Sequence, residues 1–173
     1  MSIFLRAKNW ELFLVLVGSM FIAQSIMFSS LHGDGTSHPL VIMLSTFVMG
    51  GLLFGWLWAI ASACSKAMPS ELYSSPKPMQ FGLIYALLYI GFFGVVFGSP
   101  TMPQVYIFIP HLLAMAAIFY SLGFTAKQLT KLEQGKNVSF FSYSGPFFLF
   151  WFFPLGVWFV QPKVNELLGN KNA

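Results

Sequence analysis

The sequence predicts an all-α protein, a polytopic bundle of transmembrane helices with four spans and a short, Pro-kinked fifth segment. Hydrophobic residues make up 57% of the 173 residues, and the mean hydropathy is +0.73. Only 8% of residues are charged, whereas soluble domains carry about 25%. So few charges cannot cover a water-facing surface, and the apolar excess must therefore face lipid. The length corresponds to a single transmembrane domain over residues 1–173.

Four uninterrupted apolar runs predict the four spans, at about residues 10–28, 40–63, 81–99 and 104–124. Crossing a hydrocarbon core of about 30 Å takes about 20 helical residues. A charge at the centre of a span would cost about 2.5–3.5 kcal/mol, and none of the runs has one there. Because the runs are continuous rather than alternating, they favour helices over barrel strands.

The helix of the fourth span is expected to continue into the cytoplasm over residues 125–135. Ala126, Leu129 and Leu132 keep an apolar stripe, and Gly135 is a suitable residue to end the helix.

The fifth segment, residues 144–160, is short for a span. Pro154 interrupts it and Pro162 is expected to end it. Its apolar length favours crossing the membrane, whereas the charges around it favour turning back. We take crossing as the expectation, and an interfacial or re-entrant helix as the alternative.

Basic residues predict the orientation. The N-terminus and two of the loops carry seven, against none in the two opposite loops: Arg6, Lys8, Lys66, Lys77, Lys127, Lys131 and Lys136. Cytoplasmic loops are enriched in Lys and Arg, so the N-terminus is expected in the cytoplasm, with the chain integral to the plasma (bacterial inner) membrane. The basic residues are spread between apolar runs rather than gathered in one patch, so nucleic acid is not an expected partner despite a pI near 9.3.

Small residues at four-residue spacing predict close helix packing. They are Gly51, Gly55 and Ala59 in the second span and Gly94 and Gly98 in the third. Small side chains on one face let two helices approach closely in lipid. Packing within the chain is the expected use, and a homo-oligomer face is the alternative.

Two polar residues inside spans form a candidate intramembrane site. His111 follows Pro110 in the fourth span, and Gln24 lies in the first, both toward the outer half. An ionisable group within a membrane is a functional hypothesis by default. The alternatives are a neutral histidine bonded to a carbonyl freed by Pro110, and an interhelical hydrogen bond for Gln24.

An outer loop contains three residues that could bind a metal ion, His32, Asp34 and His38. Their spacing matches no strong metal motif, and the surrounding glycines equally predict a flexible turn. The sequence specifies no cofactor otherwise. It contains no GxxxxGK[ST], HExxH, CxxC or GxSxG motif and no paired carboxylates within the spans. This argues against an ATPase, a zinc protease and a typical antiporter.

Two boxes near the ends of the chain carry a resemblance. One is Lys8–Leu14, KNWELFL; the other includes Gly156, Trp158, Phe159, Gln161, Pro162 and Asn165 in a G-x-WF-x-QP-x-x-N pattern. The pairing resembles a loose group of small, uncharacterised bacterial inner-membrane proteins, which implies that location and no particular activity. Read physically, Trp158 anchors at an interface, and Gln161 and Asn165 cap carbonyls near Pro162. A docking surface for a partner is the alternative.

The functional expectation is a non-enzymatic component or accessory subunit of a membrane complex. Its partners would be the lipid bilayer and either another protein or a second copy of the chain. The first alternative is a small transporter or channel subunit with a polar site around His111. The second is a lipid-modifying membrane enzyme that uses His111 or the outer loop.

Overall fold

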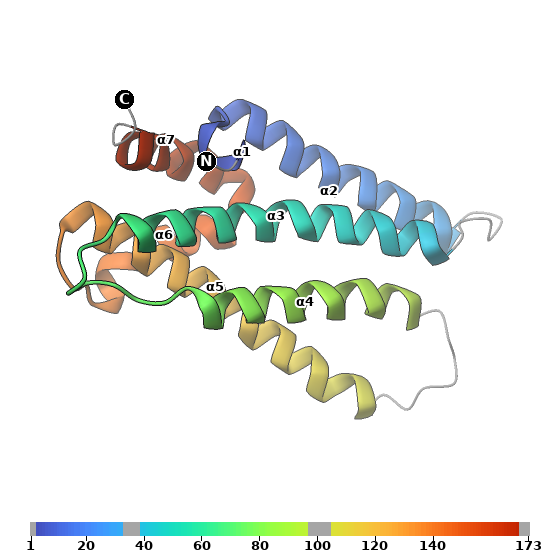
Figure 1. The fold of residues 1–173 in the computed structure, drawn as a ribbon. Coiled ribbons are helices and arrows are strands. Elements are labelled where there is room, and N and C mark those ends of the chain that lie inside the picture. The colour runs from blue at the N-terminus through green and yellow to red at the C-terminus, as the bar shows by residue number, and fades with distance from the viewer. Residues whose placement is uncertain (1–2, 33–38, 97–104, 170–173) are drawn as a thin grey trace.

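The computed structural model describes residues 3–32, 39–96 and 105–169, and every regular element in these ranges is a helix (Figure 1). This confirms the predicted all-α fold class. The helices are α1 (Ile3–Arg6), α2 (Asn9–His32), α3 (Pro39–Ala67), α4 (Lys77–Val96), α5 (Val105–Gln134), α6 (Phe140–Trp151) and α7 (Phe153–Gly169).

Three of these helices are long and apolar enough to cross a membrane. They cover Asn9–Ser29, Leu40–Ala67 and Phe108–Gln134, which correspond to the predicted first, second and fourth spans. The third predicted span corresponds to α4, whose described part has 20 residues and begins with Lys77. Residues 97–99, which the prediction included in that span, lie outside the described ranges.

Helix α3 lies at the centre of the bundle. It packs against α1, α2, α4, α5 and α7, and consecutive long helices run in opposite directions (Figure 1). Trp56, Leu57 and Ile60 of α3 are completely buried, whereas one side of each neighbouring long helix exposes large apolar side chains. The core therefore follows α3, and the outer apolar faces are those that lipid or a partner would cover.

Glycines mark the closest approaches between the long helices, although only some of the predicted positions do so. A Cβ atom on Gly82 of α4 would lie 3.3 Å from Cβ of Ala117 in α5, and one on Gly91 would overlap the ring of Phe47 in α3. A Cβ atom on Gly55 of α3 would lie 3.0 Å from the ring of Phe4 in the short helix α1.

The other predicted packing residues divide three ways. Ala59 is buried in the core, whereas a Cβ atom added to Gly51 would meet no other group within 4 Å. Gly94 lies in α4, but its burial is outside what the structure describes, and Gly98 lies outside the described ranges.

The fifth segment differs from the single kinked helix expected over residues 144–160. Helix α6 ends at Trp151, and after a break at Phe152 the chain reverses direction into α7 (Figure 1). Pro154 lies in the first turn of α7, where a missing N–H costs little, and Pro162 lies inside α7 rather than ending it. Gly156 makes the reversal possible, because it packs directly against the Leu149 carbonyl oxygen of α6.

The end of α5 is as the sequence indicated. The helix is continuous to Gln134, and Gly135 follows with a φ of 64°. The Gly135 N–H donates to the Lys131 carbonyl at 2.9 Å. This is the single hydrogen bond of a C-terminal helix cap in which the glycine takes the left-handed (αL) conformation. This sharp ending sends the chain into α6, which packs against α5.

Candidate functional site

His111 lies near the start of α5 in contact with a tyrosine of α4. The Tyr89 hydroxyl and His111 Nδ1 are 3.2 Å apart, within hydrogen-bond distance, and the two ring centroids are 5.8 Å apart. Tyr89 was not singled out from the sequence. Its pairing with His111 depends on the register between α4 and α5, which no local pattern reveals.

A second tyrosine completes this contact. Tyr85 lies one turn before Tyr89 on α4 and stacks against it at 6.4 Å, and its hydroxyl donates to the Pro110 carbonyl of α5 at 3.0 Å. We call Tyr85, Tyr89 and His111 the tyrosine–histidine cluster. It joins α4 to α5 through two polar contacts.

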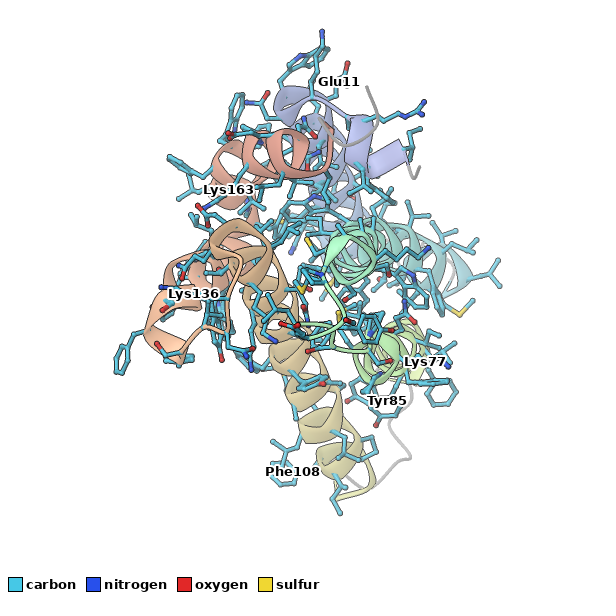
Figure 2. All side chains as sticks on the ribbon, turned by 60° about the vertical axis from the view of Figure 1, so that its left-hand side comes forward. Glu11, Lys77, Tyr85, Phe108, Lys136 and Lys163 are labelled. Carbon is cyan, nitrogen blue, oxygen red and sulfur yellow. The ribbon has the colours of Figure 1, made fainter. Side chains whose placement is uncertain are left out.

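The tyrosine–histidine cluster lies at the lateral surface of the bundle. His111 and Tyr85 are exposed, and Figure 2 shows Tyr85 on the side of α4 away from α3. The neighbouring Leu88 and Leu112 are 58% and 51% exposed. A shallow, almost wholly apolar groove of about 500 Å³ borders the cluster and runs between α3, α4 and Pro110.

The structure does not bring Gln24 to His111. Gln24 is exposed on α2, which packs chiefly against α3 and α7, whereas His111 lies on α5. The candidate site of the sequence analysis therefore divides into a cluster around His111 and a separate polar side chain on α2.

The expected outer-loop metal site falls largely outside the described residues. Asp34 and His38 lie in the undescribed range 33–38, and the side chain of His32 is likewise not described. Within the part of the chain that is described, no three His, Cys, Asp or Glu residues come together in a way that could hold a metal ion.

The C-terminal box forms contacts within the chain. Gln161 is completely buried; its Oε1 accepts from Trp56 Nε1 at 2.9 Å, and its Nε2 donates to the Phe4 carbonyl at 2.8 Å. Asn165 Nδ2 donates to the Ala7 carbonyl at 3.3 Å. These bonds hold α7 against α1 and α3, so they fasten the C-terminal helix to the N-terminal end of the chain.

The remaining residues of this box complete the contact. Trp158 packs against Phe13 of α2 with ring centroids 5.4 Å apart, although one face remains exposed. Trp56 also contacts Phe150 of α6, with ring centroids 5.4 Å apart. Both arms of the α6–α7 hairpin therefore contact Trp56.

The sequence matches no protein-family model, and neither a curated protein nor a solved structure matches the chain. Its function must therefore be inferred from the geometry of its own residues.

Proposed function

We propose that this chain is a non-enzymatic subunit of a bacterial inner-membrane complex, and that a transmembrane helix of its partner packs on α4 and α5 around the tyrosine–histidine cluster. The observation that carries the proposal is the exposure of this cluster on the outer side of two apolar helices. An ionisable side chain such as His111 within a membrane span almost always faces a protein interior or a water-filled cavity. A partner helix would provide such an interior.

The surroundings of the tyrosine–histidine cluster suit a helix rather than a polar substrate. The flanking side chains Leu88, Phe92 and Leu112 are apolar and exposed, and the bordering groove is almost wholly apolar. An apolar helix could bury these side chains while the tyrosine hydroxyls or the imidazole form an interhelical hydrogen bond, a contact worth about 0.6–2 kcal/mol in bilayers.

Three buried polar side chains of the bundle, Gln161, Ser121 and Thr125, support a structural rather than a chemical role. Gln161 is occupied by Trp56 and by backbone carbonyls. Ser121 donates to the Ala117 carbonyl at 2.7 Å, and Thr125 donates to the Ser121 carbonyl at 2.8 Å. These groups hold helices together or bond to their own helix, which is their ordinary use in a packed bundle.

We further propose that α2 to α5 are four spans, with both ends of the chain in the cytoplasm and α6–α7 entering the membrane and returning. The bonds of Gln161 and Asn165 to Phe4 and Ala7 support this arrangement, because they join the C-terminal helix to the N-terminal end. With the C-terminal segment on that side, Lys163 and Lys171 add to the seven basic residues there, and the opposite loops still have none. This is the distribution that the positive-inside rule favours.

Site-specific photo-crosslinking in native membranes tests the partner face. A photoreactive amino acid at position 88 or 112 is expected to give a discrete protein adduct, because Leu88 and Leu112 flank the tyrosine–histidine cluster and are exposed. The matched control is Phe21, which is 65% exposed on α2 and is expected to react with lipid. Lipid adducts alone at all three positions would contradict the proposal.

A further inference from the structure

A pocket of about 670 Å³ opens between the start of α4, the last turns of α5, and α6. This is the end of the bundle at which α4 begins and α5 ends (Figure 1). Its lining combines polar residues with aromatic ones. The polar lining residues are Ser74, Ser75, Lys127 and Gln128. Aromatic rings from both α5 and α6 also line it, among them Tyr143 and Phe147 of α6.

The polar part of the lining carries positive charge without a matching carboxylate in the described part of the chain. Lys131 lies one turn after Lys127 on α5, and it is only 6% exposed. Its Nζ donates to the Leu72 carbonyl at 3.4 Å and to Ser74 Oγ, which lines the pocket, at 3.3 Å. In the described ranges the one ion pair is Lys163–Glu133, so neither Lys127 nor Lys131 has an acidic partner there.

Two lysines at this spacing repel each other, and burying an unpaired ammonium group is costly. An anion beside Lys127 and Ser74 would offset both the repulsion between the two lysines and the cost of burying the Lys131 ammonium group. The pocket therefore has the charge of an anion-binding site before any ligand is considered.

Gln128 provides an independent indication of a ligand. Its side chain lines the pocket and is 1% exposed, and its Oε1 has no hydrogen-bond partner within the described structure. A buried polar group without a partner costs about 1–3 kcal/mol. A half-turn of the amide exchanges its oxygen with its NH₂ group, so Gln128 can offer a ligand either an acceptor or two donors.

The start of α4 lies at the edge of the pocket. Ser75 and Pro78 both line it, and α4 begins between them at Lys77. The dipole of this 20-residue helix favours a negative charge at this position, although the Lys77 N–H already donates to Ser75 Oγ at 3.4 Å and Pro78 has no N–H to offer. Serine hydroxyls, an amide and a lysine suit the oxygens of a phosphate group.

We propose that this pocket binds the phosphate headgroup of an anionic membrane lipid, with an acyl chain along Phe147 and Tyr143. The aromatic rings of the lining favour a lipid over free phosphate, since phosphate alone would leave them uncovered. The proposal rests on the orientation proposed above, in which this end of the bundle lies at the cytoplasmic membrane boundary. It does not depend on the partner face, which is formed by other parts of α4 and α5.

The test is lipid binding by the purified full-length protein, followed by native mass spectrometry during titration with phosphatidylglycerol or phosphatidylcholine. Phosphatidylglycerol is expected to bind preferentially. Lys127→Gln is expected to weaken its binding on the order of tenfold, the loss of one charge-assisted hydrogen bond. Ser75→Ala removes a hydroxyl that lines the pocket and accepts from the Lys77 N–H at 3.4 Å, and it is expected to weaken binding several-fold.

The matched control is Lys136→Gln, which removes one exposed charge beyond the end of α5 and is expected to leave binding unchanged. Equal weakening by Lys127→Gln and Lys136→Gln would overturn the proposal, since it would indicate general surface attraction. Equal binding of the two lipids would also overturn it. Displacement of phosphatidylglycerol by an equal concentration of inorganic phosphate would overturn the assignment to lipid. If phosphatidylglycerol did not bind as expected but a protein adduct formed at position 88 or 112, only the lipid proposal would be rejected. If phosphatidylglycerol bound as expected but no protein adduct formed, only the partner proposal would be rejected.

Discussion

Replacing Gly156 with alanine is expected to open the α6–α7 hairpin and to lower the unfolding temperature of the purified protein. The added methyl group would overlap the carbonyl oxygen of Leu149, and backbone cannot move aside as a flexible side chain can. Overpacking of this kind costs about 1–3 kcal/mol and occasionally more, and the backbone contact favours the upper part of that range. Thermal unfolding in detergent, followed by tryptophan fluorescence, measures the effect.

Gly145→Ala is the matched control, since it makes the same change in the same hairpin. Gly145 lies in α6 with nothing within 4 Å of an added Cβ atom. There alanine should be neutral or stabilise the helix by up to about 1 kcal/mol, because it restricts the unfolded chain. If Gly156→Ala and Gly145→Ala unfolded at the same temperature, the close contact between α6 and α7 would be wrong.

Replacing Gln161 with leucine is expected to release the C-terminal helix from α1 and α3. Leucine is similar in size, but it cannot accept from Trp56 Nε1 or donate to the Phe4 carbonyl. Trp56 is completely buried, so its N–H would lose its partner without gaining water. Each group left in this way costs about 1–3 kcal/mol, so we expect a total loss of about 3 kcal/mol or more.

Limited proteolysis and thermal unfolding together measure this change. Gln161→Leu should lower the unfolding temperature and expose the chain after α6 to protease. Gln24→Leu is the control, because Gln24 is exposed on an apolar helix and leucine there should not destabilise the bundle. Stability and protease resistance equal to those of the unchanged protein would reject the role assigned to Gln161.

The helices that could be predicted are those that coincide with a continuous apolar run in the sequence. The first two predicted spans, 10–28 and 40–63, correspond to apolar helices over Asn9–Ser29 and Leu40–Ala67. The end of α5 was predictable for a different local reason, since Gly135 takes the positive φ that other residues avoid. Both features depend on neighbours in the sequence alone.

The hairpin could not be predicted in this way. A proline within an apolar segment is compatible with a kink, a helix start or a reversal, and Pro154 proves to lie in the first turn of α7. The choice depends on the contact between Trp56 and Gln161, which are 105 residues apart. The small residues at four-residue spacing show the same dependence on packing. Their spacing identified Gly55 as a contact position but could not exclude Gly51.

The candidate site was predicted only in part, because its contacts join residues that are distant in the sequence. His111 stands out because it is ionisable within an apolar run, but its neighbours Tyr85 and Tyr89 are ordinary residues of another helix. No sequence pattern indicated the pocket between α4, α5 and α6. Ser74, Lys127 and Gln128 come from segments about 50 residues apart, and only the packing of α4 against α5 brings them together.

The side of the membrane on which each chain end lies tests the central claim most directly: the long helices cross a bilayer, and the last segment returns to the side of the N-terminus. Green fluorescent protein folds only in the cytoplasm of a bacterial host, and alkaline phosphatase is active only outside it. At either end of the chain, fused green fluorescent protein should fluoresce and fused alkaline phosphatase should be inactive. Alkaline phosphatase fused after Phe28 should be active. An active phosphatase at the C-terminus together with a fluorescent protein at the N-terminus would contradict the account.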